Sequence, residues 1–258
     1  MSSYVHPDVK TRNVIADNWW RERGMSSRES SRTKTPHDAQ ASTRLVATSS
    51  LAVQDPYSDE VVRFVKWYRR AQTTDIHGMS DDKLESELWK YLIDIDEMFF
   101  FSLLSRKVEQ PSGMKSLVRV RVISGSCESG WCGAYKKEGK SPTIRIWRIN
   151  KRRGEPWSFE HLIYVLAHEM CHAYLDIFTD KRHPKHQEWV NKFNGHGEMF
   201  WVLLRFISRQ MGSYLRSEAW RKELDAGEAE CYELTNTRGE PGSWGTPERT
   251  LQGGVLGP

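Results

Sequence analysis

The most informative stretch of the chain is FEHLIYVLAHEMCHAYLDIF, residues Phe159–Phe178. Its apolar residues recur at helical spacing, and Ser158 directly before it is a favourable N-cap, so we predict a buried helix. The helix contains the motif HEMCH at residues 168–172. Two histidines spaced i and i+4 lie one turn apart on the same helix face, so both imidazoles can reach a single metal ion.

The same motif supplies a base beside the metal ligands. Glu169 is turned to the side of the face that carries His168 and His172, where it can hold an activated water rather than coordinate the metal. Zinc with three protein ligands and one open position lowers the pKa of its water to about 7. The residues therefore predict a Zn²⁺ site for amide hydrolysis, with Glu169 as the general base. Two surface histidines are the alternative, but the apolar surroundings disfavour it.

Three residues are candidates for the third ligand. A metzincin would need glycine at position 175 and histidine at position 178, but Leu175 and Phe178 stand there, which excludes that class. A downstream glutamate, Glu188 or Glu198, could serve. His196 is the better candidate, because glycines flank it and an apolar helix is predicted to begin just after it.

Two motifs together resemble a known family. HEMCHAYL, residues His168–Leu175, followed by GHGEMF, residues Gly195–Phe200, resembles the SprT-like (Spartan-type) zinc metalloproteases. The segment DIDEMFF, Asp94–Phe100, is similar to the helix that precedes the small sheet of that family. The resemblance covers Ser80–Met211. It implies that His168, His172 and His196 hold the zinc, that Glu169 is the base, and that the substrates are proteins associated with or crosslinked to DNA.

The sequence departs from the family in two places. Twenty-three residues separate His172 from His196, which makes the intervening loop longer than usual. Only Cys231 lies beyond His196, so the cysteine-rich zinc-binding piece that many members carry there, and use partly to grip DNA, is not expected. We expect His183 and His186, in the long loop, to be exposed.

The remaining patterns predict an α+β fold in which helices surround a small antiparallel sheet, and the resemblance implies that this is a zincin-like SprT domain. Helices are predicted from Ser58, from Ser80 almost to Lys107, and over residues 197–211, and three short strands lie within residues 118–149. We expect the domain to span residues 58–225. The polar stretch 1–57 and the Gly/Pro-rich stretch 226–258 are expected to be disordered tails.

Positive charge is concentrated in one part of the chain. The net charge is only +4, but residues 103–153 carry 13 basic and 3 acidic side chains. Four arginines alternate with apolar residues and predict one solvent-facing row: Arg119, Arg121, Arg145 and Arg148. Lys151, Arg152 and Arg153 extend it. A focused basic face is typical of nucleic-acid binding, so DNA is a predicted partner through residues 106–153, with an ordinary solvated sheet face as the alternative.

Composition narrows the class of protein further. The first residues contain no apolar core of a secretory signal, and no run of 18 apolar residues occurs, so we expect no membrane partner. These features predict an intracellular protein but do not separate the nucleus from the cytoplasm; the resemblance to DNA-associated SprT-like proteases favours the nucleus. Two other functions stay open: a nucleic-acid-binding module whose zinc is structural, and an intracellular protease that is independent of DNA.

Overall fold

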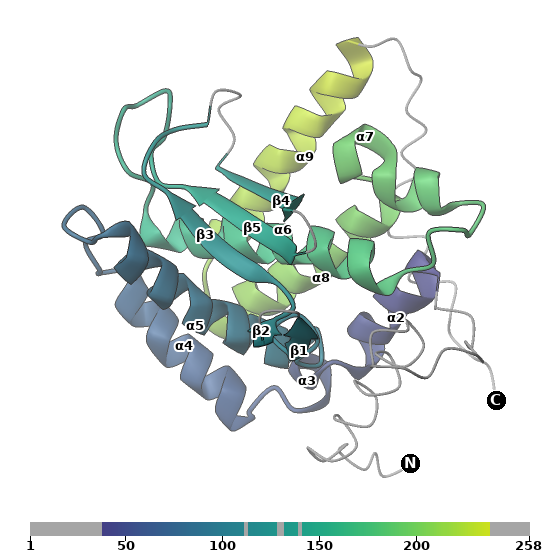
Figure 1. Cartoon of the computed structure of the whole chain (residues 1–258), viewed down its shortest axis with the longest axis horizontal. Coiled ribbons are helices and arrows are strands. Elements are labelled where there is room, and N and C mark those ends of the chain that lie inside the picture. The colour runs from purple at the N-terminus through teal and green to yellow at the C-terminus, as the bar shows by residue number, and fades with distance from the viewer. Residues whose placement is uncertain (1–37, 111–112, 128–131, 139–140, 238–258) are drawn as a thin grey trace.

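The computed structural model describes residues 38–110, 113–127, 132–138 and 141–237. Over these ranges the chain is a mixed α+β structure in which helices surround a small sheet (Figure 1). The helices before the sheet are α2 (Ala39–Ser49), α3 (Leu51–Gln54), α4 (Asp59–Ala71) and α5 (Asp81–Phe99). The strands are β1 (Lys107–Gln110), β2 (Gly113–Ser116), β3 (Arg119–Ile123), β4 (Gly133–Glu138) and β5 (Ser141–Trp147). The helices after them are α6 (Phe159–Phe178), the π-helix η1 (Gln187–Asn191), α7 (Lys192–Gly195), α8 (Glu198–Leu215) and α9 (Ala219–Thr237).

Serine caps begin the long helices where the sequence predicts. At the start of α4 the Ser58 hydroxyl accepts a hydrogen bond from the Val61 amide. At the start of α5 the Ser80 hydroxyl accepts one from the Lys83 amide. At α6 the Ser158 hydroxyl accepts the His161 amide at 3.1 Å. Each cap satisfies an amide that has no partner within the helix, and acidic residues in the first turn complement the helix dipole.

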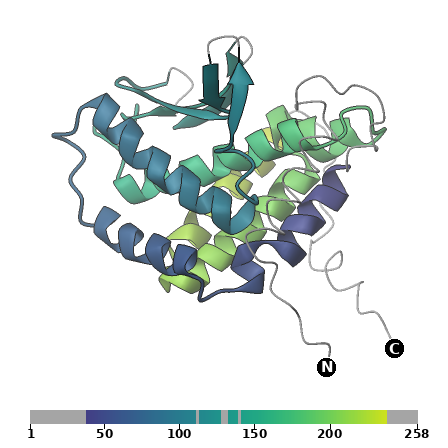
Figure 2. The same cartoon turned by 60° about the horizontal axis from the view of Figure 1, so that its bottom comes forward.

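The sheet is mixed, which corrects the expected antiparallel arrangement. Its order is β3-β5-β4, with β3 parallel to β5 and β4 antiparallel to β5. The alternation in β3 does hold, because Val120 and Val122 are buried whereas Arg119 and Arg121 are exposed. Alternation fixes which face each strand buries, but it carries no information on which strand is its neighbour. A separate antiparallel hairpin, β1–β2, projects from the body (Figure 2).

Helix α5 ends earlier than predicted, at Phe99. The apolar period continues beyond this point, but Phe101 and Ser102 adopt left-handed backbone conformations with φ of 59° and 58° and turn the chain. The buried carboxylate of Asp96 accepts the amides of Leu104 and Ser105 and holds this turn. Apolar residues after Phe99 are therefore buried as a compact turn, not as a further helical stretch.

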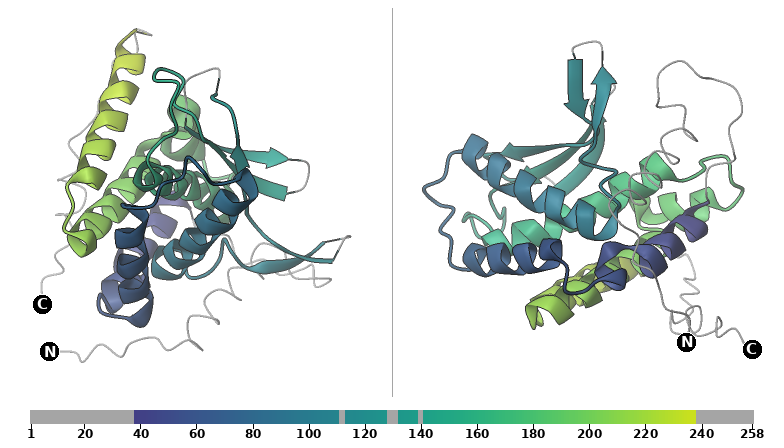
Figure 3. Two further views of the ribbon diagram at one scale, coloured as in Figure 1. Left: turned by 90° about the vertical axis from the view of Figure 1, so that its left-hand side faces the viewer. Right: turned by 90° about the horizontal axis from the view of Figure 1, so that it is seen from below.

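Part of the expected N-terminal tail belongs to the folded body. Helices α2 and α3 lie within residues 1–57 and pack on later helices, with Val46 and Ala52 almost fully buried. The Ser42 carbonyl accepts the Tyr174 hydroxyl of α6. At the other end, α9 continues to Thr237, and Figure 3 shows it on the side opposite the β1–β2 hairpin. Residues 1–37 and 238–258 of the expected tails lie outside the described ranges.

Helix α6 is the central element of the core. It contacts β4 and β5 on one side and α5 and α8 on others, and fifteen of its twenty residues are buried. A helix that is apolar on nearly all sides is typical of a core position. No helix in the described part of the chain is both long enough and apolar enough to cross a bilayer.

Candidate metal centre

Helix α6 places His168 and His172 side by side. Their Nε2 atoms are 3.2 Å apart and their ring centroids are 5.0 Å apart. The HEMCH segment lies in the middle of the twenty-residue helix, so neither histidine is in a fraying end. A rigid, buried helix therefore fixes the position of both imidazoles.

The chain returns His196 to the same point through an unusual turn. Phe193, Asn194 and Gly195 all have positive φ, of 52°, 60° and 96°, and they lead directly to His196 just before α8. Glycine suits position 195 for two reasons. A φ of 96° is a backbone conformation that residues with a side chain rarely adopt, and a Cβ there would lie 3.2 Å from Nδ1 of His172. Gly197 is equally constrained, because a Cβ would lie 2.4 Å from the Trp189 carbonyl.

Three imidazole nitrogens converge at this point. Nε2 of His196 lies 3.1 Å from Nε2 of His168, and one ligand atom from each of the three histidines lies within 4.8 Å of the others. Phe200 of α8 packs beneath the rings and stacks on His172, with centroids 4.2 Å apart. These three residues could hold one metal ion.

The surroundings keep these imidazoles neutral, as metal ligation requires. Desolvation, with a smaller contribution from His196, lowers the pKa of His168 to about 3. Desolvation also lowers the pKa of His172 and His196. Neutral imidazoles each present a lone pair, so the donor set suits zinc or a similar transition metal.

Glu169 is buried beside the histidines, not among them. Its side chain accepts the backbone N–H of Tyr135, and desolvation raises the pKa of this carboxyl to about 8. Gly133 makes room for it, because a Cβ there would lie 2.7 Å from Oε1 of Glu169 and 2.5 Å from Cγ1 of Val165. Strand β4 thus positions the carboxylate of Glu169, the residue that the sequence predicts as the base.

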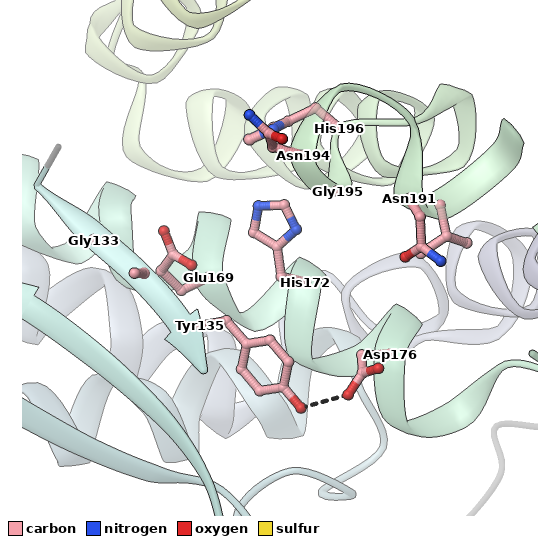
Figure 4. Close-up of a pocket in the computed structure, with 11 residues that line it drawn as sticks. Gly133, Tyr135, Glu169, His172, Asp176, Asn191, Asn194, Gly195 and His196 are labelled. Atoms are coloured by element: carbon pink, nitrogen blue, oxygen red, sulfur yellow. Dashed lines mark hydrogen bonds between the residues drawn. The ribbon is translucent and has the colours of Figure 1, made fainter. Parts of the chain in front are cut away.

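A cavity of about 240 Å³ joins these groups. Figure 4 shows Glu169 at one side, His172 and His196 at the centre, and Asp176 with Asn191 at the other side. The remaining lining comes from Gly133, Ala134, Tyr135, Val190, Asn194 and Gly195. Tyr135 N–H points from β4 toward α6, so the edge of β4 that is not paired with β5 faces this cavity.

The other histidines and glutamates considered from the sequence lie away from the cluster. Glu188 and Glu198 are exposed and do not belong to the three-histidine group. His183 is half-buried and stacks on Trp189. The expectation that His186 is exposed is wrong, because it is 5% exposed and its ring contacts the Thr179 hydroxyl.

The predicted basic row is partly present. Arg119 and Arg121 are exposed on β3, and Arg121 is in register with Arg145, which is half-buried on β5. The placement of Arg148 on this solvent face is wrong. Lys151, Arg152 and Arg153 are exposed in the turn after β5.

Arg148 is a structural residue. It is 9% exposed, and its guanidinium donates to the carbonyl oxygens of Ile76, His77 and Met79 and pairs with Asp81 at 3.2 Å. Arg148 follows Arg145 by three residues, so the two-residue alternation of a strand places it on the opposite face, with the buried Ile144 and Ile146.

Sequence reasoning did not identify Gly133, Tyr135 or Asp176 as residues of the cavity. Asp176 could have been found, because it continues the series His168, His172 at the same four-residue spacing. Gly133 and Tyr135 carried no such signal, since their proximity to α6 depends on the position of β4 in the sheet. Comparison with family models, curated proteins and solved structures finds no match to this chain.

Proposed function

We propose that this protein is a zinc-dependent metalloendopeptidase that resembles the SprT-like proteases. The observation that supports the proposal best is the convergence of His168, His172 and His196. Two of them, His172 and His196, line a cavity that Glu169 also lines. Zinc held by three protein ligands supplies Lewis-acid activation of a water and of a peptide carbonyl. The neutral, convergent imidazoles fit that ion.

Glu169 is assigned the proton transfers. Its carboxylate oxygens would accept a proton from the attacking water and deliver it to the nitrogen of the leaving amine. Burial keeps competing water away from this carboxylate, and the Tyr135 amide fixes its orientation. Strand β4 would bind the substrate, because its cavity-facing edge offers main-chain groups along which an extended peptide can pair.

The proposal also includes the class of substrate: we propose that the enzyme cleaves proteins that are associated with DNA or crosslinked to it. It is supported by the exposed side chains of Arg119 and Arg121 on β3, by exposed Lys136 on β4 at the other edge of the sheet, and by the exposed cluster Lys151–Arg153. Phosphate contacts by such residues are independent of sequence and weaken with salt.

The deciding experiment compares the zinc-loaded chain with its Glu169→Gln variant. Both are incubated with an unstructured protein and with a basic DNA-binding protein, in the absence of DNA and with single-stranded or duplex DNA. We expect cleavage that falls by about 10²–10⁴ in the variant, while the zinc content stays unchanged. Stimulation by DNA would support the DNA-associated role.

The alternatives give different results in the same assay. A DNA-independent protease would cleave with dependence on Glu169 but without response to DNA. Full DNA binding by both proteins, with bound zinc and no cleavage of either substrate, would favour a nucleic-acid-binding module with a structural zinc and would contradict the peptidase.

A further inference from the structure

The part of the cavity away from the three histidines is polar and is formed by side chains that peptide hydrolysis does not require. Tyr135, Asp176, Asn191 and Asn194 line it. Asp176 follows His172 by four residues on α6, so its carboxylate projects from the same helix face. One turn of helix separates the two residues, which corresponds to about 6 Å along the helix axis. Figure 4 shows Asp176 and Asn191 flanking the cavity at this end.

Both carboxylate oxygens of Asp176 are in contact with donors. The Tyr135 hydroxyl donates to Oδ2 at 2.7 Å, and Nζ of Lys181 pairs with Oδ1. Desolvation, together with the adjacent Asp176 charge, raises the pKa of Tyr135, so its phenol stays protonated and continues to donate. The side chain of Asp176 is 26% exposed. A carboxylate that is partly removed from water but still reachable favours a cationic partner.

Lys181 is a replaceable partner. Its side chain is 45% exposed, and it extends from the loop that follows α6. Ion pairs with this exposure contribute little to stability, because the long side chain loses entropy and water screens the charge. A second cation arriving through the cavity can therefore take the place of Lys181 on Oδ1, while Tyr135 keeps the carboxylate in position through Oδ2.

We propose that Tyr135, Asp176 and Asn191 form a specificity subsite for a lysine or arginine side chain of the polypeptide substrate, one or two residues from the scissile bond. The inference rests on the proposed peptidase function. An extended peptide advances about 3.3 Å per residue, so such a side chain is offset from the histidines by about the distance that separates Asp176 from His172. The Asn191 amide nitrogen donates to Gln187, which directs the amide oxygen as the acceptor for the cation.

Cleavage-site profiling tests this assignment. The zinc-loaded enzyme digests a mixed peptide library, and mass spectrometry records the residues around each cut, with a lysine-acetylated copy of the library as a chemical control. The variants are Asp176→Asn, which keeps the side-chain shape, and Lys181→Ala, which removes the internal competitor. Glu188→Gln is the matched control, because it removes one exposed charge from η1 without touching the cavity.

We expect a basic residue to be enriched at one fixed position by at least about fivefold, equivalent to about 1 kcal/mol. Asp176→Asn should abolish this enrichment and preserve cutting at other sites, whereas Lys181→Ala should increase it. Acetylation should abolish it at lysine, and Glu188→Gln should leave it unchanged. A merely structural role of Asp176 would lower all cleavage without altering the sequence preference, and that result would overturn the inference.

A binding measurement separates failure of the inference from failure of the peptidase proposal. Zinc-loaded Glu169→Gln is titrated with a lysine-containing peptide and its acetylated copy, with and without Asp176→Asn in the same chain. Discrimination between the two peptides that disappears with Asp176→Asn supports the subsite even if the wild-type chain cleaves nothing. Equal binding of both peptides, or discrimination that survives Asp176→Asn, overturns it.

Discussion

Nδ1 of His196 lies 3.1 Å from the carbonyl oxygen of Phe193, and this contact determines how His196 presents its other nitrogen. A neutral imidazole has one N–H, so a hydrogen bond to the carbonyl places that N–H on Nδ1 and leaves the lone pair on Nε2. Phe193 reaches this position because its φ of 52° is left-handed. Phe193, which is outside the proposed ligand set, thus orients His196 in the way that supporting residues of metal sites commonly orient a ligand.

Zinc should stabilise the fold through all three histidines. A metal that binds only the folded chain raises the free energy of unfolding by about 2.7 kcal/mol at a hundredfold excess over its dissociation constant. We expect zinc to raise the unfolding temperature of the wild-type chain and a chelator to reverse the shift. His196→Ala should lose most of this response, measured by thermal unfolding with metal analysis.

His183→Ala provides the control for that measurement, because His183 lies in the same loop but stacks on Trp189 outside the cluster. It should keep the full response to zinc. If His196→Ala still bound one zinc with an unchanged shift, the third ligand would have to be another residue, and Glu198 would become the first to test.

Gly133→Ala should separate catalysis from metal binding. The added Cβ would lie 2.5 Å from Cγ1 of Val165 and 2.7 Å from Oε1 of Glu169, so these two side chains have to move, and none of the three atoms nearest to it belongs to a histidine. Misplacement of a catalytic group by about 1 Å can cost about a hundredfold in rate. We expect a large fall in peptidase activity with zinc content retained. The control Ala134→Gly, on the same strand, should leave both peptidase activity and zinc content nearly unchanged. Unchanged activity in Gly133→Ala would remove Glu169 from the mechanism.

The histidine cluster could be predicted because its main signal is local. The spacing of His168 and His172 is geometry within one helix, and the glycines around His196 marked a tight turn before a helix. Tyr135 and Asp176 were missed for different reasons. Asp176 repeats the four-residue spacing and was overlooked, whereas Tyr135 reaches α6 only because β4 is an edge strand.

Arg148→Met should destabilise the protein strongly, since the carbonyl oxygens of His77 and Met79 would lose their donor. The Ile76 carbonyl and Asp81 would each lose one donor and keep another, the Met79 amide and the Ser124 hydroxyl. Each buried polar group left without a partner costs about 1–3 kcal/mol, so we expect a loss of several kcal/mol in urea unfolding. Arg121→Met, on the exposed face of β3, is the matched substitution and should change stability by less than about 0.5 kcal/mol. Equal, small effects would contradict the structural role of Arg148.

The two exposed arginines of β3 test the part of the proposal that concerns DNA. Neutralising Arg119 and Arg121 together should weaken binding to duplex DNA and reduce its salt dependence, with the slope of log affinity against log salt falling by about 1 for each phosphate that the protein no longer neutralises. The unfolding temperature should stay the same. Double substitution without effect on affinity or slope would indicate an ordinary solvated sheet face.

The order of the sheet and the end of α5 were beyond sequence reasoning for a common physical reason. Periodicity reports which residues are buried, and both β3 and the segment after Phe99 do bury the predicted residues. It does not report what buries them. The parallel pairing of β3 with β5 and the left-handed turn at Phe101 and Ser102 depend on contacts distant in the sequence, including the Asp96 side chain.

Asp96 should make the stability of the metal-free protein depend on pH. It is fully buried, and desolvation raises its pKa to about 7 even though the Leu104 and Ser105 amides favour the carboxylate. In the unfolded chain its pKa is about 3.9. Between these values the folded chain binds the proton more tightly, so this group lowers the free energy of unfolding as pH rises from about 4 to about 7.

Asp96→Asn removes this titration. We expect the stability difference between the wild-type chain and Asp96→Asn to shift by ~2 kcal/mol toward the variant between about pH 5 and about pH 8. Urea unfolding of both proteins in the presence of a chelator measures it, and the histidines cancel in the difference because they are common to both. Parallel stability curves over this range would show that Asp96 is ionised throughout, with the two amides outweighing the cost of burial.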